Sequence, residues 1–223
     1  MSKSGIIVVL LLLPLGAHAG ELLDRIIVTV NGNALLESDW EEELHYELFM
    51  SGRPNSGFTV QDRQSALNRI VDQELLREQM RTSDFKAASA EEIGEQVSLL
   101  KTQIEHEHTG QTWGGRLREY GLSEMDIRDH VQLELNQLRV IDARLRPSIQ
   151  VDSAEVERYY REKVVPQAAG TQSVPLTEAA PKIREILTQQ KMNQLLDSWL
   201  ESLRAQAKIQ YFSPDTSAQA TQP

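Results

Sequence analysis

Residues 24–44, DRIIVTVNGNALLESDWEEEL, constrain the fold of this chain more than any other stretch. Ile26–Val30 is an apolar run rich in β-branched residues. Asn31-Gly32 is the typical dipeptide of a type I′ turn, in which both central residues need a positive φ. Ser38 and Glu41 have the spacing of a capping box, so we expect Ser38 to cap a helix. The segment therefore predicts a short β-hairpin that leads directly into a helix.

The first 19 residues have the three parts of a secretion signal. Lys3 provides the positive start, Ile6–Leu15 the apolar stretch, and Ala17-His18-Ala19 a small-x-small cleavage site. The apolar stretch is too short to span a bilayer, which needs ~20 residues, although an uncleaved anchor is the alternative. We expect a signal peptide over residues 1–19, cleaved after Ala19. The mature protein would then lie outside the cytoplasm without stable insertion in a membrane.

The charge balance is acidic, and the chain contains no cysteine. It carries 33 acidic and 23 basic residues, which gives a formal net charge of −10. Nucleic acids and anionic lipids bind basic faces, so neither is an expected partner. Without cysteine, neither disulfides nor thiolate chemistry is available. A low aromatic content, with many Gln, Glu, Leu and Ala residues, favours a mostly helical protein.

After the hairpin, the sequence predicts a series of capped amphipathic helices. Apolar residues recur every three to four positions, and Ser or Thr precedes the first turn of most of these segments. Gly121 and Pro147 end two of them. The expected helices are Asp39–Met50, a helix from Thr59 through Leu75, a helix from Ser89 through Ile104, Thr112–Tyr120, Ser123–Leu145 and Ser153–Val164. In the fifth of these, the expected buried stripe is Ile127, Val131, Leu138, Ile141 and Leu145.

The C-terminal third contains a linker, a long helix and a strand. Val165–Pro175 is uncharged and has two prolines, which predicts a linker. Thr177–Ala207 reads as one helix, because Pro181 falls in the first turn, where no intrahelical hydrogen bond is lost. Lys208–Phe212 alternates like a strand, and Ser213–Pro223 lacks large apolar residues and should be a disordered tail. A two-stranded hairpin is marginal alone, so we expect Lys208–Phe212 to add a third strand to it.

The long helix carries apolar residues on two nearly opposite faces. The face of its first half includes Ile183, and the face of its second half includes Trp199. A helix that packs on one body has a single stripe. The helix therefore either breaks near Gln190 or, as we favour, contacts two bodies. The second half would pack into the core formed by Trp40 and the early helices, and the first half against Ser153–Val164 or a second protomer.

Three stretches of the chain resemble the SurA-type periplasmic chaperones: DRIIVTVNGNALLESDW, RLREYGLSEMDIRDHVQLELNQLRVIDARLRPSIQVDSAEVERYY and SWLESLRAQAKIQYF. In that family, an N-terminal segment of hairpin and helices is completed by a C-terminal helix and strand. The resemblance covers nearly all of Leu23–Phe212. It implies a mainly α protein: a helical chaperone domain with a small three-stranded antiparallel sheet. Residues 20–164 and 176–212 would form this one domain.

The chain departs from that family between these two parts. Such chaperones usually carry one or two parvulin-type prolyl isomerase domains there, whereas this chain has only residues 165–175. Eleven residues cannot contain a parvulin core, so we expect no isomerase active site. The resemblance therefore implies the chaperone module alone.

Catalytic, cofactor and metal motifs are absent from the sequence. It has no GxSxG elbow, P-loop, GxGxxG or HExxH motif. His106 and His108 lie in an acidic cluster, but residues two apart on a helix point about 200° from each other and cannot converge on one ion. We therefore expect no catalytic residues, no cofactor-binding residues and no metal ligands.

The expected function is that of an ATP-independent periplasmic holdase, which binds unfolded or partly folded envelope proteins, including outer-membrane precursors. Such a protein needs exposed, adaptable apolar surface. The client-binding candidates are large apolar residues off the expected core stripes, although they could instead complete the core. They are Phe49, Met50, Leu76, Met80, Phe85, Trp113, Tyr120 and Met125. The alternatives are a dedicated protein-binding or scaffold module in the periplasm and, less expected, a peptidyl-prolyl isomerase. The chain could also form a homodimer in which the two copies exchange their C-terminal helices.

Overall fold

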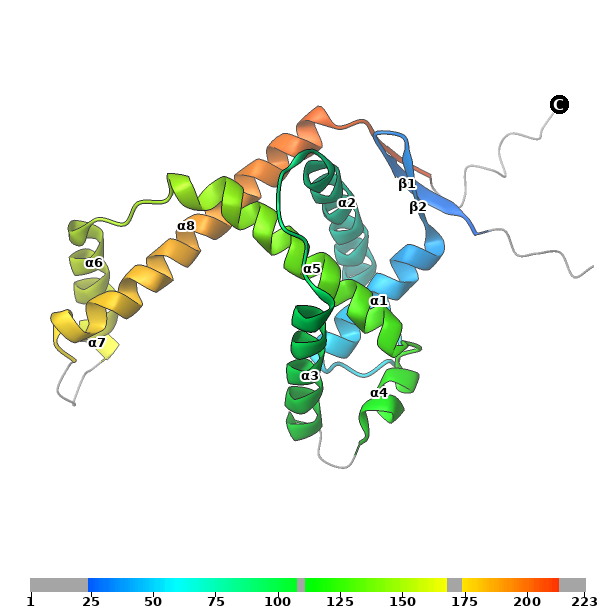
Figure 1. Ribbon diagram of the computed structural model, residues 1–223, viewed down its shortest axis with the longest axis horizontal. Coiled ribbons are helices and arrows are strands. Elements are labelled where there is room, and N and C mark those ends of the chain that lie inside the picture. Colours follow the sequence, from blue (N-terminus) through cyan, green and yellow to red (C-terminus); the bar gives the residue numbers. More distant parts are fainter. Residues whose placement is uncertain (1–23, 108–110, 168–173, 213–223) are drawn as a thin grey trace, which may run out of the picture.

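The computed structural model describes residues 24–107, 111–167 and 174–212, and it shows a mainly helical chain with one small sheet (Figure 1). This confirms the expected fold class. The expected signal peptide, the tail after Phe212 and residues 168–173 of the expected linker lie outside the described residues.

The sheet joins the two ends of the described chain. Strands β1 (Ile26–Val30), β2 (Asn33–Leu36) and β3 (Ile209–Tyr211) form an antiparallel sheet in the order β2-β1-β3. Asn31 and Gly32 connect the first two strands with φ values of 51° and 92°, as the hairpin turn requires. The predicted third strand is therefore confirmed, and it lies beside β1.

Hydrogen bonds at both ends of β3 fix its register against the hairpin. The Asn31 N–H donates to the Lys208 carbonyl at 3.0 Å, and the Lys208 N–H donates back to Asn31 Oδ1 at 2.8 Å. At the other end, the Phe212 N–H donates to the Ile27 carbonyl at 2.8 Å. The turn residue that shapes the hairpin thus also anchors the C-terminal strand.

Helix α1 (Glu37–Ser51) begins earlier than the capping-box spacing predicts. Its N-cap is Leu36, whose N–H donates to Asp39 Oδ2 at 2.8 Å. Ser38 lies inside the first turn, and its hydroxyl binds the Asp24 carboxylate. The prediction that Ser38 caps this helix is wrong, because β2 runs directly into the helix and leaves the cap position at Leu36.

The caps predicted for the next helices are confirmed. Thr59, Ser89 and Ser123 each accept a hydrogen bond from the backbone N–H three residues later, at 3.1–3.2 Å. Thr112 does the same for the short helix that follows α3. The helices that these residues start are α2 (Val60–Thr82), α3 (Ala90–Glu107), α4 (Trp113–Glu119) and α5 (Glu124–Leu145), and a 3₁₀ turn, η1 (Arg146–Ser148), ends α5.

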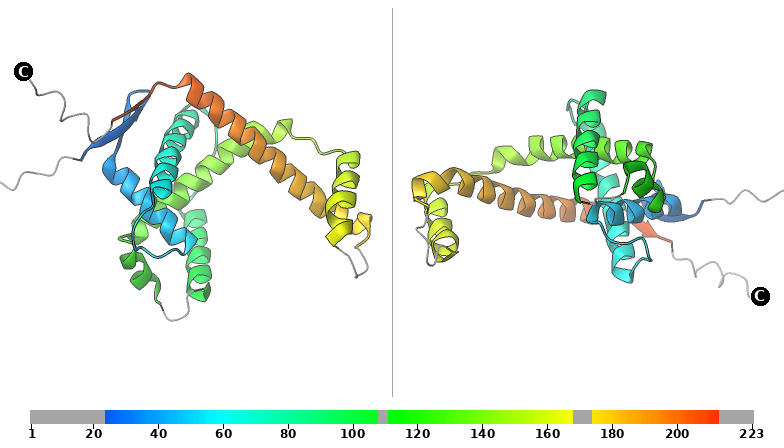
Figure 2. Two further views of the ribbon diagram at one scale, coloured as in Figure 1. Left: turned by 180° about the vertical axis from the view of Figure 1, so that it is seen from behind. Right: turned by 90° about the horizontal axis from the view of Figure 1, so that it is seen from below.

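We call the sheet together with α1–α5 the head. Its buried residues form one cluster among α1, α3, α4 and α5, and a second beneath the sheet against α2. A third cluster joins α2 and α5 to the C-terminal half of α8 (Leu176–Gln206). Figures 1 and 2 show α8 crossing α5 and then extending away from the head.

The far end of α8 packs against a second, smaller body. Helix α6 (Ser153–Tyr159) continues through a π-helical turn, η2 (Tyr160–Val164), into α7 (Val165–Gln167), and α6 lies against α8 (Figure 2). The predicted linker is therefore wrong for its first three residues, because Val165–Gln167 form the helical α7. Ile183 of α8 and Val156 of α6 are both buried.

The prediction that the long helix contacts two bodies is confirmed, and α8 does not break near Gln190. Its C-terminal half packs on the head, but Trp199 lies in the third cluster with Leu76 and Val140 rather than beside Trp40. Trp40 belongs to the second cluster. None of the helices in the described ranges is both long and apolar enough to cross a membrane.

Candidate functional site

Three large apolar side chains from three helices remain exposed on one surface of the head. Met50 of α1, Leu99 of α3 and Leu138 of α5 are 45%, 63% and 61% exposed. They line one hollow of about 250 Å³. We call this surface the apolar groove, and its apolar residues are Tyr46, Met50, Leu99, Leu100, Val131, Leu135 and Leu138. Gln96, Gln103 and Glu134 supply its polar rim.

A second hollow lies farther along α5, toward its C-terminal end, and extends the surface toward the long helix. It has a volume of about 460 Å³ and reaches Ile141 of α5 and Met192 of α8. Leu135 and Leu138 line both hollows, so they form the ridge between them. The surface therefore offers two neighbouring depressions that share one apolar ridge.

Leu138 is exposed because α5 packs on different neighbours along its length. Ile127 and Val131 are buried against the first cluster, whereas Val140 and Leu145 are buried in the third. Val140 lies about 180° around the helix from Val131, at ~100° per residue. The buried side of α5 thus changes between these residues, and Leu138 is left in solvent. The single predicted stripe through Leu138 is wrong at this position.

Leu99 is exposed for a simpler reason. The buried side of α3 carries Ile93, Val97 and Ile104, and Leu99 stands about 200° from Val97 around the helix axis. It therefore points away from the first cluster and toward the open side of α5. A large apolar residue off the buried stripe is the signal that could have identified it in the sequence.

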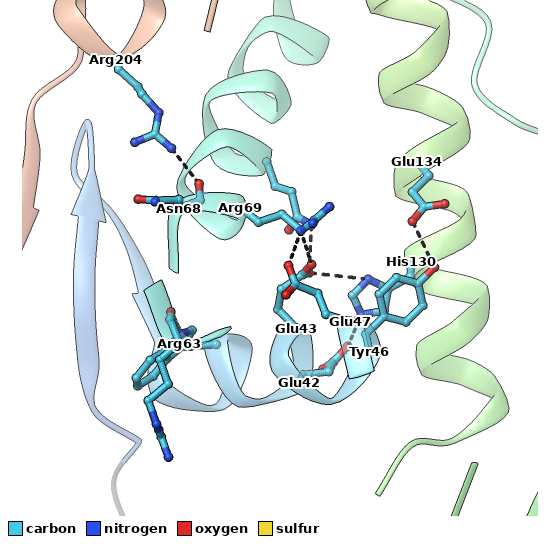
Figure 3. Close-up of polar contacts among 12 residues, drawn as sticks. Glu42, Glu43, Tyr46, Glu47, Arg63, Asn68, Arg69, His130, Glu134 and Arg204 are labelled. Atoms are coloured by element: carbon cyan, nitrogen blue, oxygen red, sulfur yellow. Dashed lines mark hydrogen bonds and ion pairs between the residues drawn. The ribbon is translucent and has the colours of Figure 1, made fainter. Parts of the chain in front are cut away.

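A stacked pair of rings holds α1 against α5 beneath the groove (Figure 3). The Tyr46 and His130 rings are nearly parallel, at 3°, with centroids 3.8 Å apart. The Tyr46 hydroxyl donates to Glu134 Oε1 at 3.0 Å. Because Tyr46 and Glu134 also line the groove, these contacts fix the wall to which Met50 belongs.

Glu43 is buried beside this stacked pair and links three helices (Figure 3). Its carboxylate accepts a hydrogen bond from Gln73 Nε2 at 2.9 Å and lies 3.1 Å from Arg69 Nε. Arg69 Nε also contacts Glu47, at 2.5 Å. Burial raises the pKa of Glu43 to about 7, even though the Gln73 hydrogen bond and the Arg69 charge oppose that shift.

His130 faces the same carboxylate from α5. Its Nδ1 lies 3.9 Å from Glu43 Oε2, and burial lowers the pKa of His130 to about 4. Its Nε2 lies 3.2 Å from Glu42 Oε1 but makes no well-aligned hydrogen bond. The imidazole is therefore neutral at pH 7. We assign Glu43 and His130 to the support of the groove, because their side chains lie beneath it and not on its surface.

The apolar groove can bind apolar side chains by removing them from water, and only three of its ten lining residues, Gln96, Gln103 and Glu134, have polar side chains other than tyrosine. In residues 24–107, 111–167 and 174–212, no group of three or more His, Cys, Asp or Glu side chains could hold a metal ion. His106 is exposed at the end of α3, and His108 lies outside the described residues.

Four of the eight predicted client-binding residues are buried in the core. Phe49 meets Trp113 and Tyr120 edge to face, with centroids 5.6 Å and 5.7 Å away, and Leu76 lies in the third cluster. The expectation that these four side chains are exposed is wrong. They are covered by side chains from other parts of the fold: Phe49 and the pair Trp113 and Tyr120 cover one another, and residues of α5 and α8 cover Leu76.

The other four predicted residues lie nearer the surface. Met80 and Phe85 are partly buried against the third cluster, and Met50 and Met125 are exposed. Only Met50 belongs to the apolar groove. Leu99, Leu135 and Leu138, which complete the groove, were not among the predicted residues.

The chain was compared with protein-family models and with curated proteins. No protein-family model matches the chain, and a search of curated proteins finds no significant match.

Proposed function

We propose that this protein is an ATP-independent periplasmic holdase that binds apolar segments of unfolded or partly folded envelope proteins, including outer-membrane precursors. The observation that carries the proposal is the exposure of Met50, Leu99 and Leu138 on one hollowed surface. A contiguous exposed apolar surface is typical of a protein-binding site.

The strength of binding that this surface offers suits reversible holding. Full burial of one aliphatic side chain contributes roughly 1.5–3 kcal/mol, and immobilising a flexible client opposes part of that gain. Two depressions on either side of Leu135 and Leu138 would hold about two client side chains at once. Binding of this kind is weak enough to be released without an energy source.

The periplasmic location rests on the signal pattern over residues 1–19. Mass spectrometry of the exported protein should give a mature chain that starts at Gly20. An intact Met1 would contradict both the signal and the location.

The holdase activity is tested by adding the mature protein to an unfolded outer-membrane barrel protein and following light scattering. We expect aggregation to slow at near-stoichiometric ratios. Leu138→Glu places a charge in the groove and should remove most of this effect. Val60→Glu is the matched control, because Val60 is 87% exposed and lies outside the groove, so this variant should act like the wild type.

Two outcomes of aggregation assays and one of a refolding assay separate the alternatives. Equal activity of the two glutamate variants would show that the groove is not the client site. A dedicated scaffold would bind one envelope protein and leave unrelated clients unprotected. A prolyl isomerase would accelerate proline-limited refolding beyond its uncatalysed ~10–100 s timescale.

A further inference from the structure

The outer edge of the sheet presents backbone groups for pairing at β2. Val30 pairs with Asn33 across the two-residue turn, so the backbone groups of Asn33 and Leu35 point toward β1. The N–H and C=O of Ala34 point to the opposite, open side, and Ala34 is exposed. An edge strand of this kind is a template for an added strand.

A hollow of about 480 Å³ adjoins this open edge. Ala34 and Leu35 form its border on the sheet, and Gln73 and Glu74 of α2 lie along it. Helix α5 closes the far side with Asp129. A strand added to β2 would therefore place the side chains of one face over this hollow.

The charges around the hollow are predominantly negative. Its carboxylates, apart from the buried Glu43 with its raised pKa of about 7, are Asp39, Glu42, Glu74 and Asp129. Its two arginines, Arg77 and Arg81, both bind Glu74, and His130 is neutral.

No arginine is therefore available for the rim carboxylates Glu42 and Asp129. The pKa of Glu42 is raised by partial burial and then by the neighbouring charges of Asp126, Asp39 and Asp129. The smaller part of this shift comes from the negative charges that neighbour Glu42.

We propose that the β2 edge and its acidic hollow bind an extended, basic segment of a client polypeptide, with the client backbone paired to Ala34 and its lysine or arginine side chains directed at Glu42 and Asp129. The inference rests on the proposed function for its choice of an unfolded polypeptide as ligand. A second copy of this acidic chain would bring two acidic hollows together, so charge complementarity disfavours it. A client with alternating apolar and basic residues would satisfy the edge and the hollow together.

The experiment uses a fluorescein-labelled, acetylated heptapeptide of alternating valine and lysine, with binding measured by fluorescence anisotropy at low salt. We expect binding that weakens with added salt. The double variant Glu42→Gln with Asp129→Asn should weaken it about two- to thirtyfold, because each of the two partly exposed ion pairs contributes ~0.2–1 kcal/mol. The control double variant, Asp197→Asn with Glu201→Gln, changes the net charge equally on the exposed surface of α8 and should leave affinity unchanged.

Two further peptides test the pairing itself. A version N-methylated at every residue cannot donate backbone hydrogen bonds from either edge and should bind at least tenfold more weakly, as should a valine–glutamate version. Absence of binding, equal binding of the N-methylated peptide, or equal losses in the two double variants would overturn the inference. The proposed holdase function is tested separately, by measuring aggregation suppression. This assay compares the double variant Glu42→Gln with Asp129→Asn against Leu138→Glu.

Discussion

His130 Nδ1 lies 3.9 Å from Glu43 Oε2 across the contact between α1 and α5, so that a buried imidazole faces a buried carboxyl without a hydrogen bond between them. Burial raises the pKa of Glu43 from 4.5 to about 7 and lowers the pKa of His130 from 6.5 to about 4. Between these limits, the folded pair carries no net charge. The stacked rings of Tyr46 and His130 therefore stand beside a neutral pair, even though the surrounding residues are strongly acidic.

The first prediction concerns the pH dependence of the free energy of unfolding, to which the two residues of this pair make opposite contributions. Protonated Glu43 makes the free energy of unfolding fall as pH rises from 4.5 to about 7, because the unfolded carboxyl has already lost its proton. Neutral His130 makes it rise between about pH 4 and 6.5, because the unfolded imidazole still holds its proton. The two effects cancel between pH 4.5 and 6.5. Glu43→Gln should remove the first, so its stability relative to wild type should increase by ~3 kcal/mol across that window.

Urea unfolding at several pH values measures this difference directly. Glu41→Gln, on the exposed side of α1, is the control and should show a profile parallel to wild type. Parallel profiles for Glu43→Gln as well would show that the buried carboxyl is not protonated in the folded state.

The second prediction concerns Trp199, which joins the long helix to the head. Its side chain is buried in the third cluster, and the Arg144 guanidinium lies 4.9 Å from the ring centroid. Trp199→Ala should lower the free energy of unfolding by ~3–5 kcal/mol, because it leaves a cavity between α2, α5 and α8. Asp197→Ala, on the exposed side of the same turn, should change it by less than ~0.5 kcal/mol. Similar melting of the two variants would mean that α8 is a peripheral element.

The third prediction compares two serines with the same sequence signal and different positions in the fold. Ser123 caps α5 and accepts a hydrogen bond from the Asp126 N–H at 3.2 Å, whereas Ser38 lies within the first turn of α1, two residues after the N-cap Leu36. Thermal or urea unfolding should show that Ser123→Ala costs ~0.5–2 kcal/mol. Ser38→Ala removes only an exposed contact and should cost less than ~0.5 kcal/mol. A larger loss for Ser38→Ala would restore it as the cap of α1.

The fourth prediction concerns the closure of the chain by its C-terminal helix and strand. A chain ending at Pro175 lacks the cover that α8 gives to Leu76, Val140 and Leu145, so we expect it to lose cooperative melting. A chain ending at Ala207 lacks only β3. It should keep α8 in place, and hydrogen exchange at the Asn31 amide should accelerate, because that amide donates to the Lys208 carbonyl.

A chain ending at Phe212 is the control for both truncations and should melt like the full mature protein. Cooperative melting of the chain ending at Pro175 would show that residues 24–167 fold by themselves. The single-domain arrangement inferred from the sequence would then be wrong.

Part of the candidate site was accessible from the sequence, and part was not. Met50 was predicted as client-binding and lies in the groove, whereas Phe49, its neighbour, fills the first cluster against Trp113 and Tyr120. Both residues are large and apolar at the end of the same helix. Their different exposures depend on α3, α4 and α5, whose positions no local pattern in α1 encodes.

The sequence by itself determined the features that depend on residues close together in the chain. These include the Asn31-Gly32 turn, the caps at Thr59, Ser89 and Ser123, and the two opposite apolar faces of α8. Local backbone preferences and side-chain periodicity suffice for such features, because the interacting groups lie within a few residues of each other.

Only the tertiary structure decided which apolar residues remain in solvent and which charges are buried. Leu138 is exposed because α5 changes partners between Val131 and Val140, and the pKa of Glu43 is raised because α2 and α5 cover its carboxyl. Burial depends on every element that packs around a side chain, and those elements come from distant parts of the sequence. The groove, which is a set of residues left uncovered, is therefore fixed only when all the helices are in place.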